Sequence, residues 1–100
     1  MYLYMIRRRG GWSSPDELGK TADRSKQVAD DDYPDDIAWI RSYVIDEGDG
    51  KLGTVCIYQA SSEQAVRDHA DSVEMPADEV RPIVDTVIVR PDPEPAAAQA

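Results

Sequence analysis

Apolar residues follow two different spacings along the chain, and together they predict both strands and helices. Four stretches are rich in β-branched and aromatic residues, as strands are. They cover residues 2–8, 37–45, 54–59 and 81–90. Two other stretches carry apolar residues at helical spacing and cover residues 15–29 and 62–73. The resulting order of strand, helix, strand, strand, helix and strand is typical of a ferredoxin-like α+β fold, with two helices on one face of an antiparallel sheet.

Two serines mark where the predicted helices begin. Ser14 lies just before Pro15 and three residues before Glu17, an arrangement that caps a helix N-terminus. Ser61 stands three residues before Gln64, and the pair is predicted to form a capping box in the same way.

The middle two strands are predicted to form a hairpin, because Gly48 and Gly50 supply the positive φ angles of its loop. Strict alternation along the first of these strands gives both of its faces apolar side chains. One face carries Ile37, Trp39, Arg41, Tyr43 and Ile45, and the other carries Ala38, Ile40, Ser42 and Val44. Because the helices cover only one face of such a sheet, the other face would expose an apolar patch. We therefore expect a homodimer that buries it.

The length of 100 residues fits one domain with a single core. We predict that this domain covers residues 1–91. Residues 92–100 consist mainly of Pro, Glu, Ala and Gln, without branched or aromatic residues, and predict a disordered C-terminal tail.

The net charge of -9 argues against nucleic-acid binding, which depends on cationic contacts with phosphates, and against binding to anionic membranes. No apolar run approaches the roughly 20 residues that span a bilayer. Residues 1–9 carry their positive charge after a short apolar stretch, the reverse of a signal peptide. The only cysteine, Cys56, fits a reducing compartment. We therefore expect a cytoplasmic protein.

His69 is the only histidine, and helical spacing places it between Val66 and Val73 on the inward face of the second helix. An imidazole there can act as a metal ligand or as a general acid/base. It can equally be a structural residue that is hydrogen-bonded to a backbone carbonyl or a tyrosine. One cysteine and one histidine cannot supply the ligands of a zinc site.

Four other side chains are predicted to cluster where the two hairpin strands pair. Arg41 and Tyr43 lie two residues apart on one strand, and Cys56 and Tyr58 do the same on the next. Such a cluster would bind an anion or a small polar ligand. Arg41 can also be structural, in which case its charge requires an acidic partner such as Asp85.

Two charged stretches are better explained without a ligand. Residues 30–36 are acidic but lack the glycine and the terminal glutamate of a calcium loop, so we expect a solvated segment. Arg7, Arg8 and Arg9 end a strand with no helix N-terminus behind them, so we expect them to be solvated or paired with acidic residues. The sequence contains no nucleophile elbow, phosphate loop or dinucleotide fingerprint.

Four short motifs lie within residues 2–91. They are Trp39-Ile40-Arg41-Ser42-Tyr43-Val44, Cys56-Ile57-Tyr58, Val66-Arg67-Asp68-His69-Ala70 and Met75-Pro76-Ala77-Asp78. Together they resemble a family of small bacterial proteins, grouped as a domain of unknown function, that includes a nickel-binding protein. The resemblance implies a ferredoxin-like homodimer of the dimeric α+β barrel type, with nickel sequestration or detoxification as the function.

The chain departs from the family's pattern at charged positions. Arg41 stands where the family is expected to have a histidine, and Arg7 and Arg8 stand where an acidic residue is expected. Since these arginines would repel a cation, the resemblance carries over only His69 as a metal ligand and implies a weakened or altered metal site.

The leading hypothesis is therefore a small dimeric binding protein of this family, not an enzyme, with nickel or another divalent cation near His69. The alternative is an enzyme of the dimeric α+β barrel type that binds a small molecule. In it, Arg41, Tyr43 and Tyr58 would bind the substrate, with His69 as general acid/base in an isomerase- or cyclase-like reaction. A third hypothesis is a module that binds a protein partner through its acidic surface.

Overall fold

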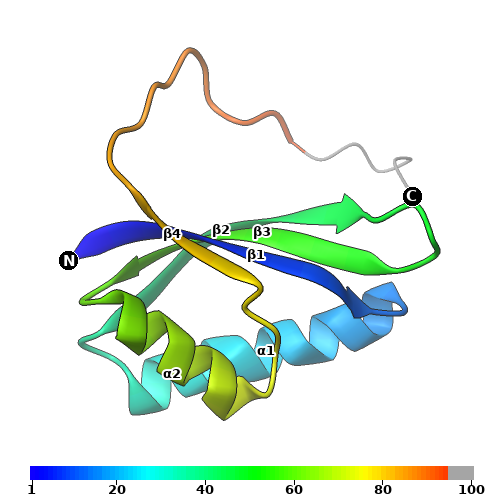
Figure 1. Ribbon diagram of the computed structural model, residues 1–100, viewed down its shortest axis with the longest axis horizontal. Coiled ribbons are helices and arrows are strands. Elements are labelled where there is room, and N and C mark those ends of the chain that lie inside the picture. Colours follow the sequence, from blue (N-terminus) through cyan, green and yellow to red (C-terminus); the bar gives the residue numbers. More distant parts are fainter. Residues whose placement is uncertain (95–100) are drawn as a thin grey trace.

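A computed structural model describes residues 1–94 and contains a four-stranded sheet and two helices (Figure 1). In chain order the elements are β1 (Tyr2–Trp12), α1 (Pro15–Asp32), β2 (Ile37–Asp46), β3 (Leu52–Ala60), α2 (Glu63–Val73) and β4 (Glu79–Ile83). The strand order is β2-β3-β1-β4, and every neighbouring pair is antiparallel. Both helices lie on one face of the sheet (Figure 1). The predicted ferredoxin-like α+β fold is confirmed.

Serine side chains cap both helices, although the second cap is not the predicted one. Helix α1 begins as predicted, with Ser14 as its N-cap. Helix α2 is capped by Ser62, whose Oγ accepts a hydrogen bond from the Ala65 N–H at 3.1 Å. The predicted cap, Ser61, instead donates its hydroxyl to the Asp36 carboxylate at 2.9 Å and so joins the start of α2 to the segment before β2.

A bulge in β2 changes which of its side chains face the helices. Trp39 is paired with Tyr58 and Arg41 with Ile57, so Ile40 is an extra residue with no counterpart on β3. One extra residue reverses the alternation of all the side chains that follow it. The faces predicted for this strand are therefore wrong after Trp39. The helix-facing side chains are Ile37, Trp39, Ser42 and Val44, and those on the opposite face are Ala38, Arg41, Tyr43 and Ile45.

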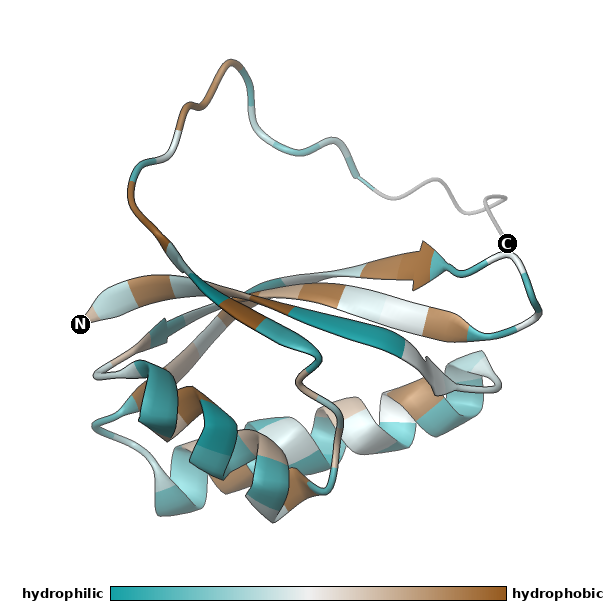
Figure 2. Cartoon of the chain, viewed as in Figure 1, coloured by the Kyte–Doolittle hydropathy of each residue, from teal (hydrophilic) through white to brown (hydrophobic). Residues whose placement is uncertain are grey.

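The last strand is shorter than the predicted residues 81–90 and ends at Ile83. Strand β4 pairs only with β1, and Ile83 lies opposite Leu3. Because the two strands are antiparallel and β1 begins at Tyr2, β4 has almost no strand left to pair with beyond this point. The rest of the predicted strand leaves the sheet and passes over the face opposite the helices, where Figure 2 shows its hydrophobic stretches.

The core lies between the sheet and the helices, where Ile6, Tyr58 and Val66 are buried. We call the face of the sheet opposite the helices the outer face. Its half-buried apolar side chains are Leu3, Met5, Ile45, Val55, Ile57 and Ile83. Within residues 1–94, neither helix is long and apolar enough to cross a bilayer. Of the predicted tail, residues 95–100 lie outside the described part of the chain.

Candidate functional site

His69 lies on α2 with its side chain fully buried against the sheet, as the helical spacing predicts. Its Nε2 donates a hydrogen bond to the backbone carbonyl of Ser25 on α1 at 3.0 Å. The ring packs edge-on against Tyr33, with 5.8 Å between centroids, and is tilted against the Tyr58 ring, with 5.7 Å between centroids. His69 therefore joins both helices to the sheet, which is the structural role considered from the sequence.

The imidazole of His69 is held in its neutral form. Burial lowers its pKa, the bond to the Ser25 carbonyl opposes that shift, and the positive charge of Arg8 lowers the pKa further. Because a carbonyl oxygen only accepts hydrogen bonds, Nε2 carries the hydrogen and Nδ1 is left as an acceptor. Nδ1 is buried and has no hydrogen-bond partner among residues 1–94.

The surroundings of His69 do not fit the nickel site that the resemblance implies. Nickel favours a set of imidazole and other donor ligands. Across residues 1–94, no three His, Cys, Asp or Glu side chains come together in a group that could hold a metal ion. One ring nitrogen of His69 is already bonded to the Ser25 carbonyl, and the nearby charge of Arg8 repels a cation. The acidic residues 30–36 form no such group either.

Arg41 and Tyr43 lie on the outer face, away from His69. The Asp92 carboxylate accepts a hydrogen bond from the Tyr43 hydroxyl at 2.5 Å and one from Arg41 Nη1 at 3.1 Å. These bonds, the one from Tyr43 first, hold the pKa of Asp92 below its ordinary value. The acidic partner of Arg41 is therefore Asp92 and not the predicted Asp85.

The residues predicted to form one polar cluster are divided between the two faces of the sheet. Cys56 and Tyr58 are buried on the helix-facing side, whereas Arg41 and Tyr43 are more than a third exposed on the outer side. The division follows from the bulge at Ile40, because without it Arg41 and Tyr43 would share a face with Tyr58.

A hollow of about 430 Å³ lies between the sheet and α1, and we call it the α1 hollow. Its volume falls in the range of small-molecule pockets. The apolar side chains around it include Trp12, Leu18, Ala22, Trp39, Val44 and Met75. The polar ones on the sheet are Arg8, Arg41, Ser42, Thr54, Cys56 and Tyr58. Ile40 and Val44, on the edge strand β2, also line the hollow and are 47% and 55% exposed, so it opens to solvent along β2.

Arg8 is the residue of this hollow that the sequence interpretation missed. Its side chain is 1% exposed and lies over the Tyr58 ring, with 5.9 Å from the guanidinium carbon to the ring centroid. Nη1 donates to the backbone carbonyl of Pro76, whereas Nη2 is buried with no acceptor. No ion pair within residues 1–94 involves Arg8. Alternation from Tyr4 through Ile6 places Arg8 on the core side and could have revealed it.

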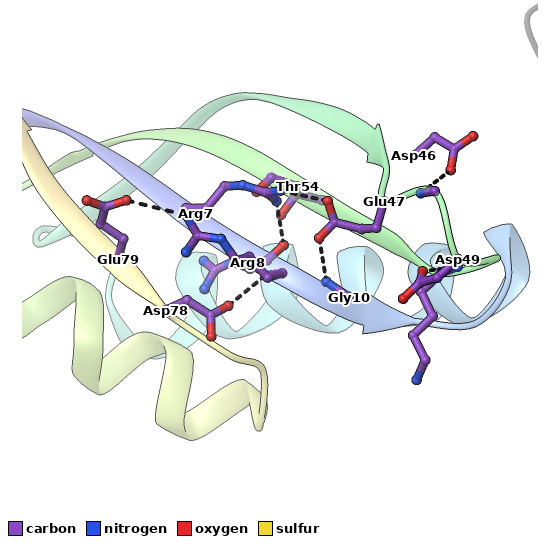
Figure 3. Close-up of polar contacts among 12 residues, drawn as sticks. Arg7, Arg8, Gly10, Asp46, Glu47, Asp49, Thr54, Asp78 and Glu79 are labelled. Carbon is purple, nitrogen blue, oxygen red and sulfur yellow. Dashed lines mark hydrogen bonds and ion pairs between the residues drawn. The ribbon is translucent and has the colours of Figure 1, made fainter.

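The neighbouring arginines behave as predicted and have acidic partners. Arg7 Nη2 lies 2.6 Å from Glu47 Oε1, and the second oxygen of Glu47 accepts the Gly10 N–H at 2.8 Å (Figure 3). These bonds lower the pKa of Glu47, the one from Arg7 most strongly. Arg9 Nη2 lies 3.8 Å from Glu79 Oε1. Of the three consecutive arginines, only Arg8 is without a carboxylate among residues 1–94.

Comparison with known proteins gives the family. A family model described as nickel responsive protein SCO4226-like matches residues 4–83, which is more than half of the chain. The chain belongs to this family. Its structure is similar to the crystal structure of SCO4226 from Streptomyces coelicolor A3(2), with a TM-score of 0.69 and 19% sequence identity over 85% of this chain and 99% of that chain. At this identity the likeness shows the fold. None of the curated proteins compared with the chain matches it.

Proposed function

We propose that this member of the SCO4226-like family is a small homodimeric binding protein of the cytoplasm that holds an organic ligand in the α1 hollow. The observation that carries the proposal is the hollow itself, about 430 Å³ in volume and walled mainly by apolar side chains. Concave, mostly apolar sites with a few polar groups are where proteins bind small molecules.

Binding is favoured over catalysis because neither His69 nor Tyr58 is suited to act as an acid or base on a ligand in the hollow. His69, the candidate general acid/base, bonds to the Ser25 carbonyl and is not among the residues that line the hollow. Tyr58 does line it, but burial raises the pKa of its phenol, so the group stays protonated. A catalytic acid or base works best with a pKa near the working pH.

The nickel response of the family gives a second, separate expectation for this chain. The residues around His69 do not fit a metal site, so we expect nickel to bind weakly and without dependence on His69. Calorimetric titration of tag-free protein tests this, with His69→Gln as the variant because glutamine keeps a donor for the Ser25 carbonyl. Micromolar nickel binding that is lost in His69→Gln would contradict it.

The homodimer is proposed from the apolar surface of the outer face. The segment that passes over this face, residues 84–89, adds further apolar surface. Four of its side chains are between 76% and 95% exposed; they are Val84, Val87, Ile88 and Val89. Exposed apolar patches of this kind mark interaction sites, and in homo-oligomers a second copy is the commonest cover. The α1 hollow lies on the other side of the sheet, so dimer formation leaves it open.

A neutral fluorescent probe tests the binding function directly. Trp12 and Trp39 both line the hollow and are the only tryptophans in the chain. N-phenyl-1-naphthylamine, which is apolar and uncharged, should therefore enter the hollow and quench their emission by energy transfer. Saturable quenching at micromolar concentration is expected, and its absence would count against the proposed function.

Two substitutions on α1 make this test specific. Ala22→Phe places a large side chain in the hollow and should abolish the quenching. Lys20→Phe adds the same side chain at an exposed position of the same helix and should leave the quenching unchanged. Equal quenching in Ala22→Phe and wild type would place the bound probe outside the hollow.

A further inference from the structure

Arg8 is a buried cation whose balancing anion is not found in the described protein. Arginine stays charged in proteins, and a buried charge is normally paired with an opposite charge. Here the guanidinium is 1% exposed and lines the α1 hollow. Its Nη2 has no acceptor, and the pairing with the Pro76 carbonyl and the Tyr58 ring supplies no full negative charge. An anion that entered the hollow would meet this unsatisfied donor.

A second donor lies beside Arg8 at the end of a directed chain of hydrogen bonds. The indole N–H of Trp39 only donates, so Ser42 Oγ accepts from it at 2.8 Å. Ser42 then donates to Cys56 Sγ at 3.1 Å, and the Cys56 thiol donates to Thr54 Oγ1 at 3.2 Å. The Thr54 hydroxyl therefore keeps its own hydrogen available for another acceptor.

Thr54 and Arg8 lie on neighbouring strands and line the same hollow. They are direct cross-strand partners in the pairing of β1 with β3, both are buried, and both line the hollow. Side chains of such partners on one face of a sheet lie close together. Arg8 Nη2 and the Thr54 hydroxyl are thus two donors on the same wall of the hollow, and Nη2 has no acceptor among residues 1–94.

Building on the proposed function, we propose that the α1 hollow binds an organic monocarboxylate, with the carboxylate on Arg8 and Thr54 and an apolar body against the hydrophobic wall. A guanidinium matches the two oxygens of a carboxylate, and hydrogen bonds between charged groups are the stronger kind. The single negative charge follows from the surroundings: Arg8 is the one buried cation that lines the hollow in residues 1–94, and the other arginine there, Arg41, is exposed and already paired with Asp92.

The rest of the hollow determines the body of the ligand. Side chains of Trp12, Leu18 and Trp39 supply flat and branched apolar surface, and about 430 Å³ accommodates a ring system. A dianionic phosphate fits less well, since its second charge would be buried without a cation. Neutral His69 adds no positive charge behind Tyr58.

Three naphthalene compounds separate charge from shape in a calorimetric titration of the full chain. The probes are 1-naphthylacetate, its uncharged amide 1-naphthylacetamide, and 1-naphthyl phosphate. Wild-type protein should bind the acid about 10- to 100-fold more tightly than the amide, the range expected for a charge-assisted hydrogen bond. The phosphate should bind more weakly than the acid.

Substitutions at the two donors should remove the preference for the acid. Arg8→Met replaces the guanidinium by an apolar side chain of similar length and should make the acid and the amide bind equally. Thr54→Val removes only the hydroxyl and should reduce the preference several-fold. Arg9→Gln removes a neighbouring charge whose side chain is 57% exposed and should change neither affinity.

The outcomes distinguish a failure of this inference from a failure of the binding function. If the acid and the amide bind wild-type protein equally, or if neither binds while N-phenyl-1-naphthylamine does, the hollow is a binding site but not one for anions. If none of the probes binds, both proposals are wrong. Tighter binding of the phosphate than of the acid would contradict the assignment of a single negative charge.

Discussion

The two faces of the sheet differ in the kind of group that lacks a partner: a buried charge on one face and exposed apolar side chains on the other. The helix-facing side is covered by α1 and α2, yet it buries the charge of Arg8 without a carboxylate among residues 1–94. The outer face is open to solvent, yet its strands carry apolar side chains such as Met5 and Ile57. A charge is unpaired beneath the helices, and apolar surface is exposed on the uncovered face.

Each imbalance points to a different kind of missing partner. Apolar surface on the outer face would be covered by another apolar surface of the same size, which the proposed second copy of the chain would supply. An unpaired cation within an apolar hollow is satisfied by a small anion. The sheet thus separates the surface proposed for assembly from the site proposed for the ligand, so each can be altered without the other.

The largest expected effect comes from a charge placed on the outer face. Ile57→Glu would bury a carboxylate in the proposed dimer interface, where the guanidinium of its cross-strand neighbour Arg41 is already bonded to Asp92. We expect the dimer to dissociate about 100-fold more readily, equivalent to about 2.7 kcal/mol, because an unpaired buried charge is costly. Sedimentation velocity over a range of concentrations measures this.

A second carboxylate added elsewhere provides the control for the dimer. Gln27→Glu adds the same charge to the exposed side of α1 and should leave the dimer intact. Wild-type protein that sediments only as a monomer at high micromolar concentration would rule out the dimer altogether. A dimer that persists in Ile57→Glu would place the interface elsewhere.

The next effect concerns a polar end of the outer face, where an ion pair joins Arg7 of β1 to Glu47 of the hairpin loop. A Cβ at Gly53 would lie 2.5 Å from the Arg8 carbonyl oxygen and 2.6 Å from Glu47 Oε2. Gly53→Ala should therefore cost about 1–3 kcal/mol of unfolding free energy, as overpacking does. Denaturant titration measures it. Gly19→Ala, on α1 with nothing within 4 Å, should instead stabilise the protein by a fraction of a kcal/mol.

A smaller effect is expected on the helix-facing side, from the protonation of His69. Burial holds its pKa in the folded protein below the ordinary value of 6.5. The unfolded chain therefore gains a proton first as the pH falls, and the stability that is full above pH 6.5 declines below it. The slope from one proton is at most about 1.4 kcal/mol per pH unit.

Comparing the wild type with His69→Gln separates the effect of His69 on stability from the effect of the carboxylates, which also titrate at low pH. His69→Gln lacks the titrating group, so its stability should change less than that of the wild type between pH 6.5 and 5. Identical pH profiles of unfolding free energy in the two proteins would show that His69 is not held neutral by burial.

The order of the elements could be predicted from the sequence because local patterns determine it. Apolar spacing located both helices and all four strands, and the cap at Ser14 is local. The length of β4 could not be predicted in this way. Val84 to Val89 have strong strand propensity, but whether they pair depends on where β1 begins, far away in the chain.

The candidate site was harder to predict because one extra residue, Ile40, reverses which face of the sheet every later side chain of β2 occupies. The bulge at Ile40 depends on the pairing of β2 with β3, and no turn residue marks it in the sequence. It moved Arg41 and Tyr43 to the outer face, away from Tyr58. Arg8 was hidden among three arginines whose neighbours do have acidic partners, although its alternation with Ile6 placed it in the core.

The unfolding free energy of Arg8→Met, measured by denaturant titration without added ligand, tests most directly whether Arg8 lacks a partner inside the protein. Replacing a buried ion by an apolar side chain of similar volume is often neutral or stabilising. We therefore predict a stability within about 1 kcal/mol of the wild type, or above it. A loss of about 3–5 kcal/mol, as expected when a buried ion pair is broken, would contradict this and show that the charge of Arg8 is already balanced.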